Sequence, residues 1–283
     1  MKYLIFGGTG NIGSRVAQRL IARGEQPSVF TRDAKKAKAL FGDQVEIRLG
    51  DLEKPRSSLA DALAGIDGVF LVTDGPDLDL RDRAVAGAAK SAGVRHVVKL
   101  STLDVHSGVG TGPWHARGEA AVRESGLTFT FIQAAGFMSN ALGWSHSIRE
   151  RGVLRTSTGQ GKIAFIHPDD IADVATAALL TRDHDGKALV ITGPEALSYG
   201  EMATTIGGAI GKRVRFEEIS DEQAYASVVR WAGKGPYADA LVDIWRAVRE
   251  GRLATVSDGV PQILGRRAIS FARWAEENAN TFQ

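Results

Sequence analysis

The chain has 283 residues, of which 43% are hydrophobic and 24% charged, and its formal net charge is +2. This length is sufficient for a large core, either in one domain or in one domain with a smaller appendage. The chain contains no cysteine, which excludes disulfides, thiolate metal sites and cysteine nucleophiles. Acids and bases are interspersed, so there is no global attraction to nucleic acid or to a membrane.

No hydrophobic run approaches the roughly 18 residues that are needed to span a bilayer. The sequence enters a strand at once and lacks the features of a signal peptide, so we expect a cytoplasmic protein. The scattered histidines do not have the spacing of metal ligands, and we expect no metal.

The opening of the chain has the pattern of a dinucleotide-binding turn. A hydrophobic, β-prone segment leads into Gly7, Gly10 and Gly13, and a helical segment follows from 14 to 23. Strand, tight turn and helix together place a pyrophosphate at a helix N-terminus. We expect Gly7 to form the turn, Gly10 to admit the phosphate and Gly13 to allow close packing. The cofactor-binding residues predicted in this turn are Gly7, Thr9, Gly10, Asn11 and Ile12.

The second predicted strand, 27–31, ends on Arg32. An acid near this point holds the ribose hydroxyls of NAD, whereas an arginine accommodates the 2′-phosphate of NADP. Arg32 therefore favours NADP(H), with Lys35 and Lys36 as helpers, while Asp33 keeps NAD(H) open. The alternative for these cations is a solvated basic face on the helix that starts near residue 34.

Three further strands are predicted at 45–49, 68–72 and 94–100, separated by helices at 57–63 and 81–92. This alternation of strands and helices implies right-handed βαβ crossovers and an α/β fold with a doubly wound parallel sheet. Lys99 stands in the otherwise hydrophobic fifth strand, where it would be a surface charge at the strand end or would face the crevice.

Ligands of such sheets bind outside the carboxyl ends of the strands. The residues after the strands are therefore expected to continue the cofactor site, and we assign Asp51, Leu52, Thr73 and Ser101 to it. Asp51 would meet the adenine or, alternatively, cap the next turn. Thr73 begins a turn that would lie beside the ribose and the phosphates.

The second half begins with a helix through 124 and a sixth strand at 128–133. After this strand we expect Gly136 and Phe137 against the nicotinamide and the substrate. We place an NAD(P)-binding domain at 1–150, with 163–192 returning to it, and a smaller substrate-binding lobe mainly at 151–283. The later predicted elements are strands at 153–154, 162–166, 188–192 and 213–216, and helices at 168–180, 198–210, 222–231 and 237–249.

Taken in order, the motifs at 7–13, 50–52, 125–130 and 167–172 resemble the NmrA-like branch of atypical short-chain dehydrogenases/reductases. The resemblance covers nearly the whole chain and is closest to the reductases of quinones and triphenylmethane dyes. It implies an NADP(H)-binding Rossmann-like sheet with a small C-terminal α/β lobe.

The chain departs from typical short-chain dehydrogenases at the catalytic pair. Those enzymes use Tyr-x-x-x-Lys to pass a proton to the substrate oxygen, whereas none of the four tyrosines here has lysine four residues later. His115 and Glu119 stand in the corresponding region, which is similar to the quinone and dye reductases. Ketone reduction by the usual proton relay is therefore not expected.

A quinone, dye, imine or enone accepts hydride with little enzymatic proton transfer, so positioning supplies most of the catalysis. His115 is the candidate catalytic residue, as a hydrogen-bond or proton donor with an ordinary pKa near 6.5. Its alternative role is a helix cap or a packing residue. Large side chains that would wall an aromatic pocket are Trp114, Phe137, Met138, Trp144 and Trp231.

We thus expect an NAD(P)H-dependent oxidoreductase acting on a small aromatic or quinone-like substrate, as a monomer or homodimer. The resemblance also leaves a second function open, because the NmrA-like branch contains members that bind a dinucleotide and a regulatory protein partner without turnover.

Overall fold

The computed structural model describes residues 1–54 and 59–283 and divides the chain into two compact units. The first unit comprises 1–102, 114–133 and 168–189, and the second comprises 103–113, 134–167 and 190–283. Residues 103–113 and 134–150, which we expected in the cofactor domain, thus group with the second unit. The reason is packing, since Val109, Met138 and Ile148 are buried in the hydrophobic core of the second unit.

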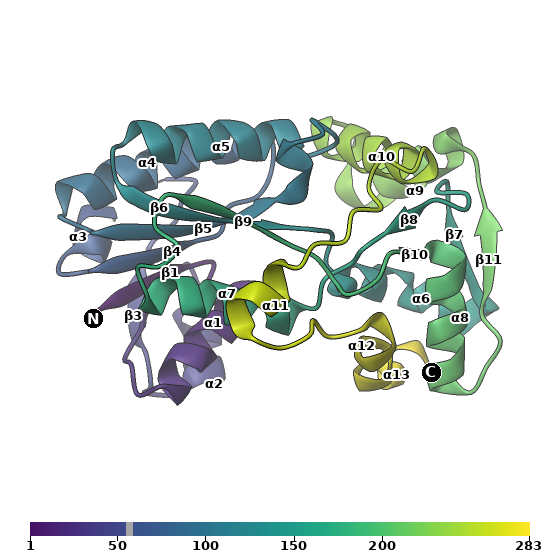
Figure 1. Ribbon diagram of the computed structural model, residues 1–283, viewed down its shortest axis with the longest axis horizontal. Helices are drawn as coiled ribbons and strands as arrows, with labels where there is room; N and C mark the ends of the chain where they lie inside the picture. Colours follow the sequence, from purple (N-terminus) through teal and green to yellow (C-terminus); the bar gives the residue numbers. More distant parts are fainter. Residues whose placement is uncertain (55–58) are drawn as a thin grey trace. The chain divides into compact units, whose positions relative to one another are not determined.

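A seven-stranded sheet forms the centre of the first unit (Figure 1). Its spatial order is β3-β2-β1-β4-β5-β6-β9, the doubly wound order with one strand added at the edge. The pairs β1–β2, β2–β3, β1–β4 and β4–β5 are parallel, and the predicted fold class is confirmed. The strands are β1 (Tyr3–Phe6), β2 (Ser28–Thr31), β3 (Glu46–Leu49), β4 (Gly68–Leu71), β5 (His96–Thr102), β6 (Thr128–Ala134) and β9 (Lys187–Ile191).

Helices cover both faces of this sheet. Figure 1 shows α1 (Asn11–Ala22), α2 (Ala34–Phe41) and α7 (Pro168–Leu180) along one face, and α3 (Leu59–Leu63), α4 (Leu78–Ser91) and α5 (Gly112–Glu124) along the other. Every residue of β1, β2 and β4 is buried, as expected for parallel strands enclosed on both faces. For the helix expected over 57–63, Ser57 and Ser58 lie outside the described residues.

Ion pairs join α1 to α7. Arg19 Nη2 lies 2.9 Å and Arg15 Nε 3.1 Å from Asp169 Oδ1, and Arg19 also pairs with Asp173. The helix α7 begins at Pro168, where proline at the first helical position loses no hydrogen bond. These contacts hold a helix from late in the chain beside the helix that follows the glycine turn.

The second unit is built from short strands and many helices. β8 (Lys162–Ile163) pairs antiparallel with β10 (Leu197–Ser198), and β7 (Val153–Thr156) pairs parallel with β11 (Arg215–Glu218). The strand expected over 162–166 is therefore shorter, although Phe137 and Ile166 form an isolated parallel bridge. The helices are α6 (Ser145–Arg151), α8 (Tyr199–Ile210), α9 (Asp221–Ala232), α10 (Pro236–Arg249), α11 (Gly259–Leu264), α12 (Phe271–Glu277) and α13 (Ala279–Phe282), with 3-10 turns at Leu103–Val105 and Met138–Trp144.

Capping boxes fix the starts of two of these helices. Ser198 caps α8 with Glu201, and Ser220 caps α9 with Gln223. In each box the serine hydroxyl accepts a backbone N–H and the longer side chain returns to the N-terminal backbone, which satisfies two otherwise unpaired donors.

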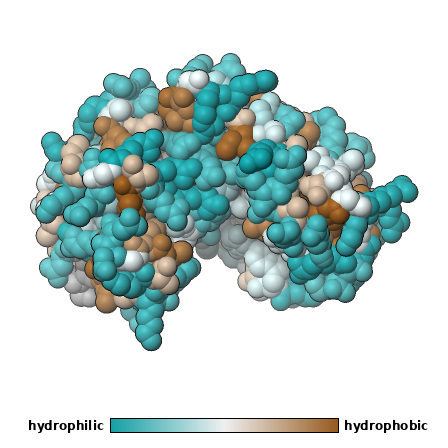
Figure 2. All heavy atoms as spheres, turned by 90° about the horizontal axis from the view of Figure 1, so that it is seen from below, coloured by the Kyte–Doolittle hydropathy of each residue, from teal (hydrophilic) through white to brown (hydrophobic). Residues whose placement is uncertain are grey.

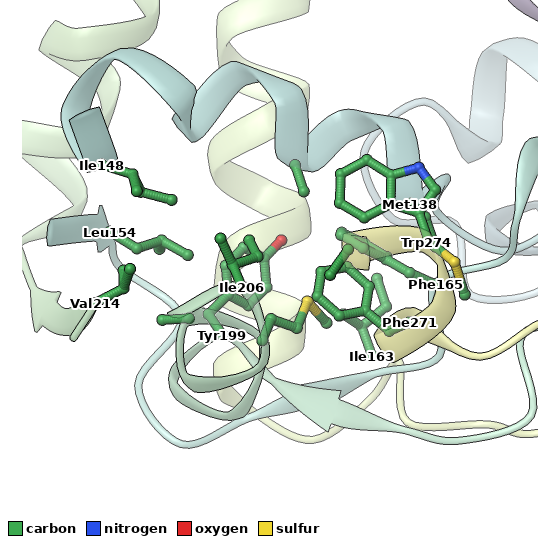
Figure 3. Packing of buried hydrophobic residues seen from close by; sticks show 14 of the residues in the cluster. Met138, Ile148, Leu154, Ile163, Phe165, Tyr199, Ile206, Val214, Phe271 and Trp274 are labelled. Carbon is green, nitrogen blue, oxygen red and sulfur yellow. The ribbon is translucent and has the colours of Figure 1, made fainter. Parts of the chain in front are cut away.

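Aromatic rings pack among aliphatic side chains in the core of the second unit, as Figure 3 shows. The ring of Tyr199 lies 6.0 Å from that of Phe165 and 5.2 Å from that of Trp144, between centroids. Phe271 and Trp274 from α12 belong to the same cluster. The C-terminal helices thus contribute directly to the core that supports the cavity described below.

The molecular face drawn in Figure 2 is mainly hydrophilic, and its hydrophobic residues form small separate patches. Among the described residues, no helix is both long enough and hydrophobic enough to cross a bilayer.

Candidate functional site

The β1–α1 turn is closely packed because it carries glycine at critical positions. Gly7 has a φ of +67°, a conformation that favours glycine, and its carbonyl accepts the Gly10 N–H at 2.9 Å. A Cβ on Gly13 would lie 2.3 Å from the Gly7 oxygen. A side chain at position 13 is therefore sterically incompatible with this approach of helix to turn.

This turn presents a backbone cradle at the start of α1. Gly10 is the N-cap residue, and no side chain of the described residues caps the helix there. Gly10 and Asn11 are exposed, whereas the side chain of Ile12 is buried, so Ile12 can offer only its backbone. Exposed N–H groups at the positive end of a helix fit a pyrophosphate.

Arg32 and Asp33, which follow β2, have different surroundings. The carboxylate of Asp33 accepts the Lys36 N–H at 3.0 Å and caps α2. The Arg32 side chain is 72% exposed, and its Nη1 is 4.0 Å from Asp51 Oδ1. Asp51 in turn accepts the Glu53 N–H at 3.0 Å, which is the turn-capping alternative for this aspartate.

Two charged residues of the first unit are fully buried: Asp82 in α4, the helix after β4, and Lys99 in β5. The Nζ of Lys99 is 2.7 Å from Asp82 Oδ2, and both side chains have no exposed area. Thr73 donates its hydroxyl to Asp82 Oδ1 at 2.7 Å and accepts from Lys99 at 3.2 Å. Both expectations for Lys99, a surface charge or a crevice residue, are therefore wrong, because Asp82 of α4 compensates its charge inside the unit.

Gly118 of α5 makes room for this ion pair. A Cβ at position 118 would lie 2.1 Å from Asp82 Oδ2 and 3.2 Å from Lys99 Cε. The absence of a side chain therefore lets α5 pack directly over the buried charges.

A second buried cluster centres on Glu119, which is only 3% exposed. Its Oε1 accepts the Ser101 hydroxyl at 2.6 Å and the Gln133 amide at 2.9 Å, and Arg123 pairs with Oε2 at 3.0 Å. The hydroxyls of Thr73 and Ser101 are thus already used within the protein, so neither supplies a free side-chain donor to a cofactor in this arrangement.

His115 lies on the same helix, one turn before Glu119. Its Nδ1 is buried and has no hydrogen-bond partner among the described residues. Burial and, second, the charge of Lys99 lower the pKa of His115 to about 3. The expectation of an ordinary histidine pKa is therefore wrong: His115 is neutral near pH 7, and it can serve as a hydrogen-bonding imidazole but not as a cationic acid.

Gly136 and Phe137 belong to the second unit, whereas the predicted cofactor-binding residues from Gly7 to Ser101 belong to the first. A Cβ at Gly136 would lie 2.7 Å from Phe165 Cε1, so glycine permits contact with that ring. Met138 is fully buried in the core, and Trp114 lies in the first unit.

The second unit contains a cavity of about 800 Å³. This volume is within the range of small-molecule sites. Its aromatic lining is supplied by Trp144, Phe165, Tyr199, Trp231, Tyr237 and Trp245. Of the side chains expected to wall an aromatic pocket, Trp144 and Trp231 do line this cavity.

The sequence signalled only one partner of the buried ion pair, as a single charge in hydrophobic surroundings. Lys99 interrupts a hydrophobic strand, whereas Asp82 stands between Arg81 and Arg83 at the charged start of its helix. Either charge read alone indicates a surface position, and only the pairing of α4 with β5 shows that they neutralise each other.

Comparison with known proteins identifies the family. Residues 7–182 match the model of the NAD(P)H-binding family. The chain is 38% identical over 283 residues to an NAD(P)H azoreductase of Xenophilus azovorans, covering 99% of this chain and 98% of the relative. It is 36% identical over 282 residues to a (4-alkanoyl-5-oxo-2,5-dihydrofuran-3-yl)methyl phosphate reductase of Streptomyces griseus, with the same coverage.

Solved structures agree with this assignment. The NADPH-dependent quinone oxidoreductase QOR2 of Escherichia coli, in complex with NADPH, matches with a TM-score of 0.87 at 25% identity, over 97% of this chain and 99% of that one. The triphenylmethane reductase of Citrobacter sp. matches with a TM-score of 0.86 over 99% of this chain and 100% of that one. At 24% identity, this match shows that the two proteins share a fold. The chain therefore belongs to the NAD(P)H-binding family and is an NAD(P)H-dependent oxidoreductase.

Proposed function

We propose that this protein is an NADPH-dependent reductase whose acceptor is a small, electron-poor conjugated molecule such as a quinone, an azo compound or an enone. The bound nicotinamide would supply the hydride. A two-electron reduction of such an acceptor also consumes one proton, which we assign to the solvent.

The observation that carries this proposal is the protonation state of the site in the first unit. His115 is neutral near pH 7, Lys99 is held by Asp82, and the Ser101 hydroxyl is held by Glu119. A carbonyl of an ordinary ketone needs an acid as hydride arrives. A conjugated acceptor delocalises the charge instead, so it suits a site that has only hydrogen bonds to offer.

The preference for NADPH rests on the end of β2. Arg32 extends into solvent, and its ion pair with Asp51 is loose, with 4.0 Å between Nη1 and Oδ1. Asp33, the residue that would favour NAD, is occupied as the cap of α2. We therefore assign the 2′-phosphate to Arg32 with Lys36, the pyrophosphate to the N–H groups of the 7–12 turn, and the adenine side to Asp51 and Leu52.

The acceptor class is supported by the relatives. One acts on azo compounds by its name, one on an unsaturated furanone phosphate, and a structural neighbour on quinones. These acceptors share a conjugated, electron-poor system, and the aromatic cavity of the second unit is suited to stacking with such a molecule.

The test is steady-state oxidation of NADPH and of NADH with a quinone, an azo dye, an enone and a simple ketone. We expect turnover with the conjugated acceptors and a KM for NADPH that rises about 10- to 100-fold in Arg32→Gln, because a charge-assisted hydrogen bond contributes about 1.5–3 kcal/mol. The KM for NADH should change little. Arg23→Gln, at an exposed arginine after α1, is the matched control.

Equal use of NADPH and NADH, with no response to Arg32→Gln, would contradict the cofactor assignment. Faster reduction of the simple ketone than of the quinone would contradict the acceptor class.

A further inference from the structure

The cavity of the second unit is charged as well as aromatic. Its lining includes three arginines, Arg151, Arg155 and Arg230, and one acid, Asp104. Arg155 is balanced by Glu217, with Nη2 and Oε1 3.1 Å apart. The cavity lining therefore carries more positive than negative charge.

Two of these arginines have no internal use. The side chains of Arg151 and Arg230 have no hydrogen bond or ion pair with any described residue. Arg151 is the last residue of α6, and Arg230 lies in the last turn of α9, where a cation also interacts favourably with the helix dipole. A dipole interaction does not require a residue to line a cavity, yet both arginines line this one.

An aromatic surface stands next to these charges. Trp231, the neighbour of Arg230 in the chain, lines the cavity and is nevertheless 67% exposed. Its ring meets that of Tyr237 edge to face, with centroids 6.1 Å apart. An exposed tryptophan and an unpaired guanidinium that line the same cavity offer a planar ligand both a stacking face and a charge partner.

The deeper wall offers neutral polar groups. The hydroxyl oxygen of Thr156 is buried and lacks a hydrogen-bond partner among the described residues. Burial raises the pKa of Tyr199, which keeps its hydroxyl protonated. Such a wall, to which Tyr199 and Phe165 contribute, suits an uncharged conjugated ring and leaves the charged end of the ligand to the arginines. Figure 3 shows these two side chains in the core beside one another.

We infer that this cavity binds a planar aromatic acceptor that carries an acidic group, namely a carboxylate, sulfonate or phosphate, and that Arg151 and Arg230 select for this charge. The inference rests on the proposed reductase function and specifies its substrate class. It predicts discrimination against cationic acceptors of the same size and shape, because a cation meets two uncompensated guanidinium groups.

The test measures binding without NADPH. Three of the five tryptophans line the cavity, so quenching of tryptophan fluorescence reports occupancy. The probes are 1,4-naphthoquinone, its 2-sulfonate and a naphthoquinone that carries a quaternary ammonium group. We expect the sulfonate to bind at least tenfold more tightly than the neutral quinone, the cation to bind most weakly, and the difference to shrink at high salt.

The variant Arg151→Gln/Arg230→Gln should reduce the preference for the sulfonate about tenfold or more while affinity for the neutral quinone stays within about twofold. Arg213→Gln removes the same charge from an exposed position of the second unit outside the cavity and should leave the preference intact. Equal binding of the three probes, binding of none, or a preference unchanged in the double variant would overturn the inference.

Steady-state turnover separates this outcome from failure of the proposed function. Loss of the charge preference with NADPH oxidation retained would remove only the inference. Selective binding of the sulfonate without any NADPH oxidation would remove the reductase function and leave the anion site in place.

Discussion

Because the Lys99–Asp82 pair is buried, we expect a single substitution in it to lower the free energy of unfolding strongly, and far more than a substitution in an exposed pair. In Lys99→Met the side-chain volume is nearly kept, but the Asp82 carboxylate loses its compensating charge while it has no exposed area. Removal of one partner of such a pair costs about 3–5 kcal/mol. This is a large part of the roughly 5–15 kcal/mol that stabilises a typical protein.

A double-mutant cycle isolates the ion pair. In Lys99→Met/Asp82→Asn neither charge remains, and the amide oxygen can still accept from Thr73 in place of Asp82 Oδ1. The double variant should therefore be more stable than the sum of the single losses predicts, by about 2 kcal/mol. Urea denaturation followed by circular dichroism measures each loss as a shift in midpoint.

An exposed ion pair between α4 and α5 is the control. Arg83 of α4 lies 2.8 Å from Glu124, but each side chain is 60% exposed, so Arg83→Met should cost less than about 1 kcal/mol. Equal losses in Lys99→Met and Arg83→Met, or strictly additive losses in the cycle, would refute the reasoning.

Three further predictions concern glycine packing and histidine protonation. Gly118→Ala should lower the free energy of unfolding by about 1–3 kcal/mol in urea denaturation because its Cβ meets Asp82, whereas Gly87→Ala, with open space around it, should not destabilise. Gly13→Ala should abolish NADPH binding in calorimetry or prevent folding, since its Cβ would lie 2.3 Å from the Gly7 oxygen. Burial and Lys99 lower the pKa of His115 to about 3. Below about pH 6.5 the unfolded chain therefore binds a proton at this histidine, whereas the folded chain does not. The free energy of unfolding should consequently fall by about 2 kcal/mol between pH 7.5 and pH 5. Urea midpoints at these two pH values should differ less in His115→Asn, and an unchanged difference would contradict the lowered pKa.

The central sheet could be predicted because buried parallel strands leave a strong local signal. Hydrophobic runs ended by glycine or a polar residue marked β1 and β4, and a β-prone run ended by Arg32 marked β2. Each strand lies within about two residues of its predicted place. The glycine spacing of the first turn was equally informative, since Gly7 and Gly13 are required by backbone geometry within a few residues.

The features that the sequence did not predict depend on contacts between segments that are distant in the chain. The low pKa of His115 arises from burial and from Lys99, which lies on a different element. The hydroxyls of Thr73 and Ser101 are occupied by Asp82 and Glu119, and no local pattern shows this. The assignment of 134–150 to the second unit likewise reflects packing against a core formed by residues from much later in the chain.

The most direct test of the proposed function is the rate of NADPH consumption by the purified protein with naphthoquinone as acceptor, measured from the absorbance of NADPH. Steady consumption, retained within about tenfold in His115→Gln because that neutral side chain can also form hydrogen bonds, is the predicted result. The account would be contradicted if the protein bound NADPH saturably but consumed none with the quinone, the azo dye or the enone. That result would favour a nucleotide sensor.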